Sequence, residues 1–312
     1  MRWLVDRIFS TIMGLAFISA QWIVRLFPRR LLLRLFEVLA DVGFYLFRGF
    51  RRRSIYNLSV ALGDRLNPRE RAETAQKSLR NFFRDFVEVA YALQAAPEAI
   101  QREIPLLGRE HLEKALAKGK GVIALSAHLG NFFLIGTRLA IEGYPTHVLV
   151  KPARNGHFMA LMDRYRLMIG QKTIHARPRR KATRELIQIL RRNEIAVVIA
   201  DEHRSSAGIS VSFFGQTVLA RRGPITLTLR TGAALVPVYM IRDPSGQLKL
   251  VVEPELELSW SGRPMENVAK NTLRLTQWLE QVVRSYPDQW NWMNIRWQEA
   301  STPARARKGE RG

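Results

Sequence analysis

Residues 119–131 read Gly-Lys-Gly-Val-Ile-Ala-Leu-Ser-Ala-His-Leu-Gly-Asn and place a lone histidine directly after an apolar run. Residues 122–125 are short, apolar and preceded by Gly121, which is the pattern of a strand buried on both faces. In open α/β sheets, ligands bind at the carboxyl ends of the strands. We therefore expect His128 to lie at the functional edge of a sheet.

Apolar runs and amphipathic stretches alternate on both sides of this segment, and they predict an α/β fold with a mixed, mainly parallel sheet flanked by helices. The expected strands are residues 121–126, 146–150, 195–200, 209–214, 234–241 and 248–252. The expected helices are residues 132–142, 156–168, 182–192, 224–230 and 265–286. We predict an α/β domain over residues 54–298 and a disordered basic tail over residues 299–312.

Residues 1–53 combine apolar stretches with arginine and contain no lysine. Residues 8–24 carry no charge, yet seventeen positions are borderline for a helix that crosses a bilayer. A secretory signal peptide is the alternative, but no Ala-x-Ala-like site closes the run, so we expect it to be retained. Residues 31–50 mix apolar and charged side chains, as a helix at a membrane interface does. We predict a membrane-associated helical segment, with a soluble protein whose first helix is buried as the alternative.

Arginines follow both apolar stretches, at Arg25, Arg29 and Arg30 and again at Arg51, Arg52 and Arg53. The positive-inside tendency therefore places the rest of the chain on the cytoplasmic side of the cytoplasmic membrane. The formal net charge of +22 calls for an anionic partner, and the clustered arginines favour anionic membrane lipids. No nucleic-acid-binding motif is present, so we expect no nucleic acid partner. The absence of cysteine excludes disulfides and thiolate metal sites.

His128 is the candidate catalytic residue among six histidines, none of which falls in a metal-binding arrangement. A histidine just before a helix can act as a general base on a hydroxyl group. Gly130 would let a substrate approach the backbone, and Asn131 would hydrogen-bond across the turn. A helix-capping turn with an incidental histidine is the alternative for this motif taken alone.

The motif resembles the strand and turn of the lysophospholipid acyltransferase superfamily, in particular its lipid A biosynthesis (lauroyl/myristoyl) acyltransferase branch. Further segments resemble that branch in the same order, namely Lys151-Pro152 with Asn155, residues 163–166, Ala200-Asp201, residues 212–215, residues 231–237, and residues 287–292 with Arg296-Trp297. The resemblance covers roughly residues 1–298.

This resemblance implies an O-acyltransferase that moves a fatty acyl chain from an acyl thioester, on acyl carrier protein or coenzyme A, to a hydroxyl of a glycolipid or lysophospholipid. It implies no cofactor stored in the protein and no metal. His128 would be the general base, and Lys151, Arg164 and Arg166 would bind phosphate groups of the substrates.

One position departs from the family signature, which has an acid five residues after the histidine. Phe133 stands there, and it cannot orient an imidazole as a carboxylate does. Asp201 follows a strand of the same predicted sheet, so we expect it to supply the carboxylate at the same edge, with Glu202 and Glu142 as weaker candidates. A loop-capping role for Asp201 is the alternative. If no acid replaces the lost one, the chain would be a catalytically impaired membrane lipid-binding or scaffold protein.

Overall fold

The computed structural model describes residue 19, residues 22–152, 156–203 and 208–293, and residues 295 and 297. Most of the apolar run 8–24 and the whole tail 299–312 lie outside the described residues, so those two predictions stay predictions. Among the described residues, no helix is both long enough and apolar enough to cross a membrane.

A seven-stranded sheet forms the centre of the described chain, in the order β1-β9-β8-β2-β5-β3-β4. Its strands are β1 (Leu106–Leu107), β2 (Val122–Ser126), β3 (Thr146–Val150), β4 (Lys172–His175), β5 (Ile195–Ile199), β8 (Ala234–Arg242) and β9 (Leu248–Val252). All neighbours pair in parallel except β8 and β9, which are antiparallel. The predicted mixed, mainly parallel sheet is confirmed.

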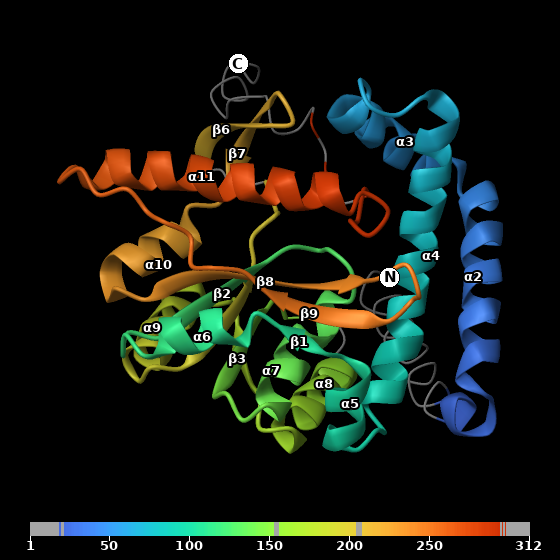
Figure 1. Cartoon of the computed structure of the whole chain (residues 1–312), viewed down its shortest axis with the longest axis horizontal. Coiled ribbons are helices and arrows are strands. Elements are labelled where there is room, and N and C mark those ends of the chain that lie inside the picture. The colour runs from blue at the N-terminus through green and yellow to red at the C-terminus, as the bar shows by residue number, and fades with distance from the viewer. Residues whose placement is uncertain are drawn as a thin grey trace, which may run out of the picture.

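Helices cover both faces of this sheet (Figure 1). The helices are α2 (Arg29–Leu46), α3 (Arg48–Leu62), α4 (Pro68–Ala92), α5 (Pro97–Glu103), α6 (Arg109–Leu116), α7 (Ile135–Ile141), α8 (Gly156–Met168), α9 (Arg179–Arg191), α10 (Gly223–Thr231) and α11 (Pro264–Ser285). Helices α9, α10 and α11 pack on one face of the sheet, and α5, α6 and α7 pack on the other.

Strand β2 lies in the middle of the sheet and is fully buried. Ile123 and Leu125 contribute to the core on one face, while Val122 and Ala124 contribute to the core on the other. This alternation is the geometry of a strand between two helical layers, and it explains why β2 is apolar throughout. His128 therefore follows a strand that is packed in the centre of the fold.

The secondary structure differs from the sequence prediction in several places, and strand β1 and helices α4, α5 and α6 were not predicted. The predicted helix 132–142 begins with a single 3-10 turn over Phe132–Leu134 and becomes α-helical only at Ile135. The extended piece 209–214 is strand β6 (Ile209–Phe213), which forms a separate hairpin with the unpredicted β7 (Gln216–Ala220). The short edge strand β4 is also unpredicted, because its four residues carry little apolar periodicity.

Helix α4 packs along α2 at one side of the molecule, where Figure 1 shows the two helices side by side. Asn67 caps α4 by accepting from the backbone N–H of Glu70, whose side chain in turn accepts from the Asn67 N–H. The predicted domain boundary at residue 53 falls inside α3, which runs without a break from Arg48 to Leu62. The chain therefore passes from the N-terminal segment into the α/β domain through continuous helix.

Candidate active site

His128 and Asp201 leave adjacent strands at the same level of the sheet. Strands β2 and β5 are parallel, with Ser126 paired to Ile199, and each functional residue comes two positions after its strand ends. The N–H of Ala200 donates to the carbonyl of Ser126 at 2.9 Å, which extends the pairing toward the site. The parallel register is thus the physical reason that residues far apart in sequence meet at one edge.

The Asp201 carboxylate holds His128 through both its backbone and its side chain. His128 Nδ1 lies 2.7 Å from Asp201 Oδ1, and the His128 backbone N–H donates to Asp201 Oδ2 at 2.9 Å. The indole Nε1–H of Trp290 also donates to Oδ2, at 2.8 Å. An ionised carboxylate with these partners favours the Nδ1–H form of the imidazole, which leaves Nε2 as the basic nitrogen. No described residue hydrogen-bonds Nε2.

The pKa values of this pair move apart, as expected for a histidine held by a carboxylate. Burial alone would raise the pKa of Asp201, but the charge of His128 and the hydrogen bonds from His128 and Trp290 lower it to about 2. Burial alone would lower the pKa of His128, but the charge and hydrogen bond of Asp201 raise it above its ordinary value. Asp201 is thus the ionised partner, and His128 is made more basic.

A cavity of about 420 Å³ opens beside this pair. Its lining residues are Phe50, Arg53, His128, Lys151, Asp201, Glu202, His203, Trp290, Met293 and Ile295. Phe50 and Arg53 come from α3, so the N-terminal helices border the cavity. Lys151 and Arg221 both pair with Glu202. We call this cavity the His128 pocket.

Glu202 and Glu142, the weaker candidates for the orienting acid, have other partners. Glu202 lies in the same pocket as His128, but its carboxylate is paired with Lys151 and Arg221. Glu142 pairs with Arg109 and Arg138 at the end of α7. Asp201 is therefore the carboxylate that the fold brings to His128.

Gly130 and Asn131 both pack against neighbouring elements of the fold. Gly130 has a φ of +52°, and a Cβ there would lie 1.9 Å from the carbonyl oxygen of Met240 in β8. The Asn131 side chain is fully buried and donates to Glu88 Oε2 at 3.0 Å. Both residues fasten the histidine loop to its neighbours, and a contact of either residue with substrate stays a prediction.

The two arginines predicted to bind phosphate lie outside the His128 pocket. Arg164 is exposed on α8 and is not among the pocket's lining residues. Arg166 is half-buried and donates to Asp163 Oδ1 at 3.1 Å. Arg164 therefore does not share a pocket with His128 and Asp201. Strand order explains this, because α8 follows β3 and leads away to the edge strand β4.

Six lining residues of the pocket were not predicted as site residues, and three of them carry polar groups. Trp290 binds Asp201, Arg53 supplies a cation from α3, and His203 stacks on Phe213 with ring centroids 4.4 Å apart. Burial is the largest effect on His203 and lowers its pKa to about 4, so its imidazole is neutral at physiological pH. The Trp-rich C-terminal motif marked Trp290 in the sequence but did not indicate its contact.

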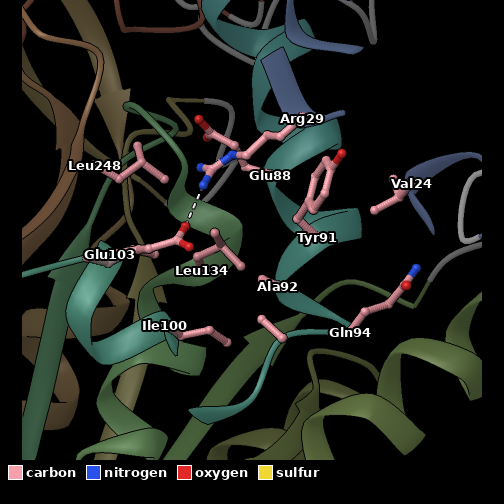
Figure 2. Close-up of a pocket in the computed structure, with 12 residues that line it drawn as sticks. Val24, Arg29, Glu88, Tyr91, Ala92, Gln94, Ile100, Glu103, Leu134 and Leu248 are labelled. Carbon is pink, nitrogen blue, oxygen red and sulfur yellow. Dashed lines mark hydrogen bonds and ion pairs between the residues drawn. The ribbon is translucent and has the colours of Figure 1, made fainter. Parts of the chain in front are cut away.

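A second cavity of about 330 Å³ lies between α4, α5 and the segment that precedes α2, as Figure 2 shows. Apolar side chains including Tyr91, Ile100 and Leu134 line it, and the ion pair of Arg29 with Glu103 borders it. It shares no lining residue with the His128 pocket. No histidine lines it, so we assign the chemistry to the His128 pocket.

The fold and the site together define a class: an α/β protein with a His–Asp pair at the carboxyl edge of a mainly parallel sheet, beside a pocket lined by both cationic and acidic side chains. A more particular assignment comes from the whole sequence. Residues 3–299 match the family of bacterial lipid A biosynthesis acyltransferases, and the chain belongs to that family.

The chain also resembles individual proteins of known name at low sequence identity. The chain is similar to the phosphatidylinositol mannoside acyltransferase of Mycobacterium tuberculosis, with 28% identity over 61% of this chain and 58% of the relative. The protein of the same name from Mycolicibacterium smegmatis is 26% identical over 66% of this chain and 67% of the relative. The lipid A biosynthesis acyltransferase of Haemophilus influenzae is 23% identical over 62% of this chain and 59% of the relative. The match to the Mycobacterium tuberculosis protein thus spans less than two thirds of that relative's length.

Proposed function

We propose that this protein transfers a fatty acyl group from an acyl thioester to a hydroxyl group of a membrane glycolipid. The observation that carries the proposal is the contact of 2.7 Å between His128 Nδ1 and Asp201 Oδ1 at the edge of the His128 pocket. Family membership supports the reaction class. Two relatives are named for the acylation of phosphatidylinositol mannoside and of lipid A, and we propose an acceptor of the same kind.

In the proposed reaction, His128 Nε2 accepts the proton of the acceptor hydroxyl as its oxygen attacks the thioester carbonyl. The tetrahedral intermediate then collapses, the carbon–sulfur bond breaks, and the leaving thiolate takes the proton from the imidazolium. The products are an ester and a free thiol, on coenzyme A or on the carrier protein. Asp201 stays ionised throughout and stabilises the imidazolium that forms between the two steps.

The cations of the His128 pocket suit the anionic parts of both substrates. Lys151 lies at the end of β3, and Arg53 reaches the pocket from α3. We propose that these residues bind a phosphate of the acceptor or donor, or the developing oxyanion, in place of the predicted Arg164 and Arg166. The pairing of Lys151 with Glu202 holds its ammonium group toward the pocket.

We further propose that the protein acts at the cytoplasmic face of a membrane, with α2 lying on the lipid surface. The side chains of α2 that are exposed and apolar are Leu31, Leu35, Val38, Leu39, Val42, Tyr45 and Leu46, and their spacing forms one stripe. The acids of this helix are paired, Glu37 with Arg84 and Asp41 with Arg80. Exposed arginines such as Arg30 and Arg34 are then available for anionic headgroups.

The non-catalytic alternative depended on Phe133 standing where the family has an acid. The pairing of Asp201 with His128 supports the enzyme instead, because it provides the orienting carboxylate from another strand. The test is an assay of the purified full chain in detergent, with labelled acyl-coenzyme A or acyl carrier protein and a total lipid extract. We expect His128→Ala to abolish transfer and His175→Ala, an exposed histidine outside the pocket, to retain it. Transfer that survives His128→Ala would remove the general-base role.

A further inference from the structure

Four phenylalanine rings form a continuous run that begins at the His128 imidazole. Ring centroids lie 4.8 Å apart for His128 and Phe132, and 4.1 Å apart for Phe132 and Phe133. The run continues from Phe133 to Phe86 at 5.9 Å and from Phe86 to Phe82 at 5.0 Å. Phe82 and Phe86 lie one turn apart on α4. We call these four phenylalanines the aromatic track.

The outer part of the aromatic track is exposed. Phe86 and Phe133 are 46% and 41% exposed, and neither is among the buried residues of a core cluster. Exposed aromatic side chains that continue from a reaction site favour an apolar binding surface.

The aromatic track also returns to the His128 pocket at its far end. Phe82 borders a small depression together with Phe50 and Met293, and both of those residues line the His128 pocket. The His128 imidazole thus contacts the ring of Phe132, and it also lines a pocket that contains Lys151, Glu202 and Arg53. This division suits a substrate with a polar head and an apolar chain.

Position 133 is free for an apolar role because Asp201 supplies the carboxylate that contacts His128. Asp201 occupies His128 Nδ1, so a carboxylate at residue 133 has no imidazole N–H left to accept from. A phenyl ring there extends the apolar surface instead. Phenylalanine at position 133 therefore contacts other aromatic rings, whereas the acid of the family signature would contact the histidine.

We infer that the aromatic track binds the alkyl chain of the acyl thioester, with the thioester carbonyl at His128 and the chain running across Phe132, Phe133 and Phe86. The inference rests on the proposed function and names a chain-binding surface for it. A saturated alkyl chain matches a surface made of phenyl rings, because the contact removes apolar area of both partners from water. Length selection then depends on how many methylene groups reach Phe86 and Phe82.

The test measures chain selection. The purified full chain receives an equimolar mixture of donors from octanoyl to stearoyl, and mass spectrometry reads the products. We expect the double variant Phe86→Ala with Phe133→Ala to lower the ratio of long-chain to short-chain product about tenfold, since contacts to methylene groups are lost. Phe133→Leu should keep most of the preference. Trp260→Ala, which removes an exposed aromatic elsewhere, should leave the profile unchanged.

A second measurement does not require turnover. A fatty acyl probe with a diazirine in its chain, loaded on coenzyme A and in parallel on acyl carrier protein, should label peptides that contain Phe86 or Phe133. Labelling of other peptides, with none on those that contain Phe86 or Phe133, would overturn the inference. A wild-type enzyme that is active but whose chain profile is the same in the double variant would overturn it too, with the proposed function intact.

Two further outcomes separate the remaining possibilities. A protein inert toward every donor, yet labelled on the aromatic track, would refute the proposed function and support the chain-binding surface. An equal loss of activity for all chain lengths, together with weaker binding to lipid vesicles, would show that the rings contact the bilayer, and it would overturn the inference. Thermal unfolding of each variant checks that the fold is retained.

Discussion

At the scale of single residues, the carboxylate of Asp201 controls the chemistry of His128. It accepts from the His128 backbone N–H and from Trp290, so both of its oxygens are fixed while it contacts the imidazole. The side chain of Asp201 is 3% exposed, and that of His128 is 20% exposed. The His128 imidazole is therefore held in place by a buried carboxylate and still lines the pocket.

Replacement of Asp201 by Asn tests this control through pH. His128 must be neutral to accept a proton, and Asp201 raises the pKa of its imidazole, so activity in the wild type falls as the pH drops below that raised pKa. Asp201→Asn removes the charge, lowers the pKa of His128 and moves the acidic limb of the kcat/KM profile to lower pH. The rate at the optimum should fall on the order of 10³-fold. Asp163→Asn is the control. If the acidic limb of the kcat/KM profile stays at the wild-type pH in Asp201→Asn, Asp201 does not set the pKa of His128.

Phe133→Glu restores the acid of the family signature, and we expect no gain in rate. His128 Nδ1 is already occupied by Asp201, and Phe133 is 41% exposed, so the new carboxylate can turn to solvent. The free energy of unfolding should fall by about 1 kcal/mol, through the loss of ring contacts with Phe132 and Phe86. Urea unfolding and steady-state kinetics measure the two effects. A marked increase in kcat would show that Asp201 does not fully orient the base.

At the scale of elements, the loop after β2 is held in place by backbone contacts with its neighbours. The N–H of Gly130 donates to the carbonyl of Gln289 at 2.9 Å, and the N–H of Asn291 donates to the carbonyl of His128 at 3.1 Å. Asn131 contacts Glu88, which belongs to a buried ionic cluster with Asp85 and Arg242. The histidine loop is therefore fixed by α4, β8 and the C-terminal segment together.

Gly130→Ala measures how tightly this loop is packed. The new Cβ would meet the Met240 carbonyl at 1.9 Å on a backbone with a φ of +52°, and we expect a loss of about 3 kcal/mol or more in the free energy of unfolding. Gly119 provides the matched control, because it has a φ of +67° and no atom lies within 4 Å of the position that a methyl group would take there. Gly119→Ala should therefore cost about 1–2 kcal/mol. Equal losses for the two variants would show that contact with β8 does not constrain the loop.

At the scale of the whole molecule, the apolar stripe of α2 faces outward on the side of α2 away from α4. Figure 1 shows α2 along one border of the molecule, with α4 between it and the sheet. Phe50 and Arg53 of the next helix line the His128 pocket, so the proposed lipid-facing surface and the reaction site are joined by α3. If α2 lies on a membrane as proposed, this arrangement brings the pocket close to lipid substrates.

Membrane binding tests this arrangement. The full chain should be recovered in the membrane pellet after fractionation of cells, and recovery mainly in the soluble fraction would refute the proposed attachment. For α2 itself, the double variant Leu35→Glu with Val42→Glu should lower partition into vesicles that contain anionic lipid by at least about tenfold, because two apolar contacts are replaced by charges. Trp260→Glu, on the segment before α11, is the control and should partition like the wild type.

The sequence by itself determined the α/β architecture, most of the strands, the family and His128 as the candidate base. These features depend on local sequence patterns and on their order along the chain. The apolar run of β2 and the alternation of strands and helices can be recognised without knowing which strands are neighbours. It also indicated Asp201, because residues that follow the carboxyl ends of parallel strands lie at the same edge of the sheet.

Only the tertiary structure decided which of these residues meet. The strand order places β5 beside β2, so Asp201 lies opposite His128, whereas Arg164 and Arg166 follow β3 on a helix that leads to the sheet edge. Packing also decided that Gly130 lies against β8 and that the Asn131 side chain donates to Glu88. The contact of Trp290 with Asp201 joins segments 89 residues apart. Such contacts depend on strand order and helix packing, which are set by the burial of the whole core and leave no periodic signal in the chain.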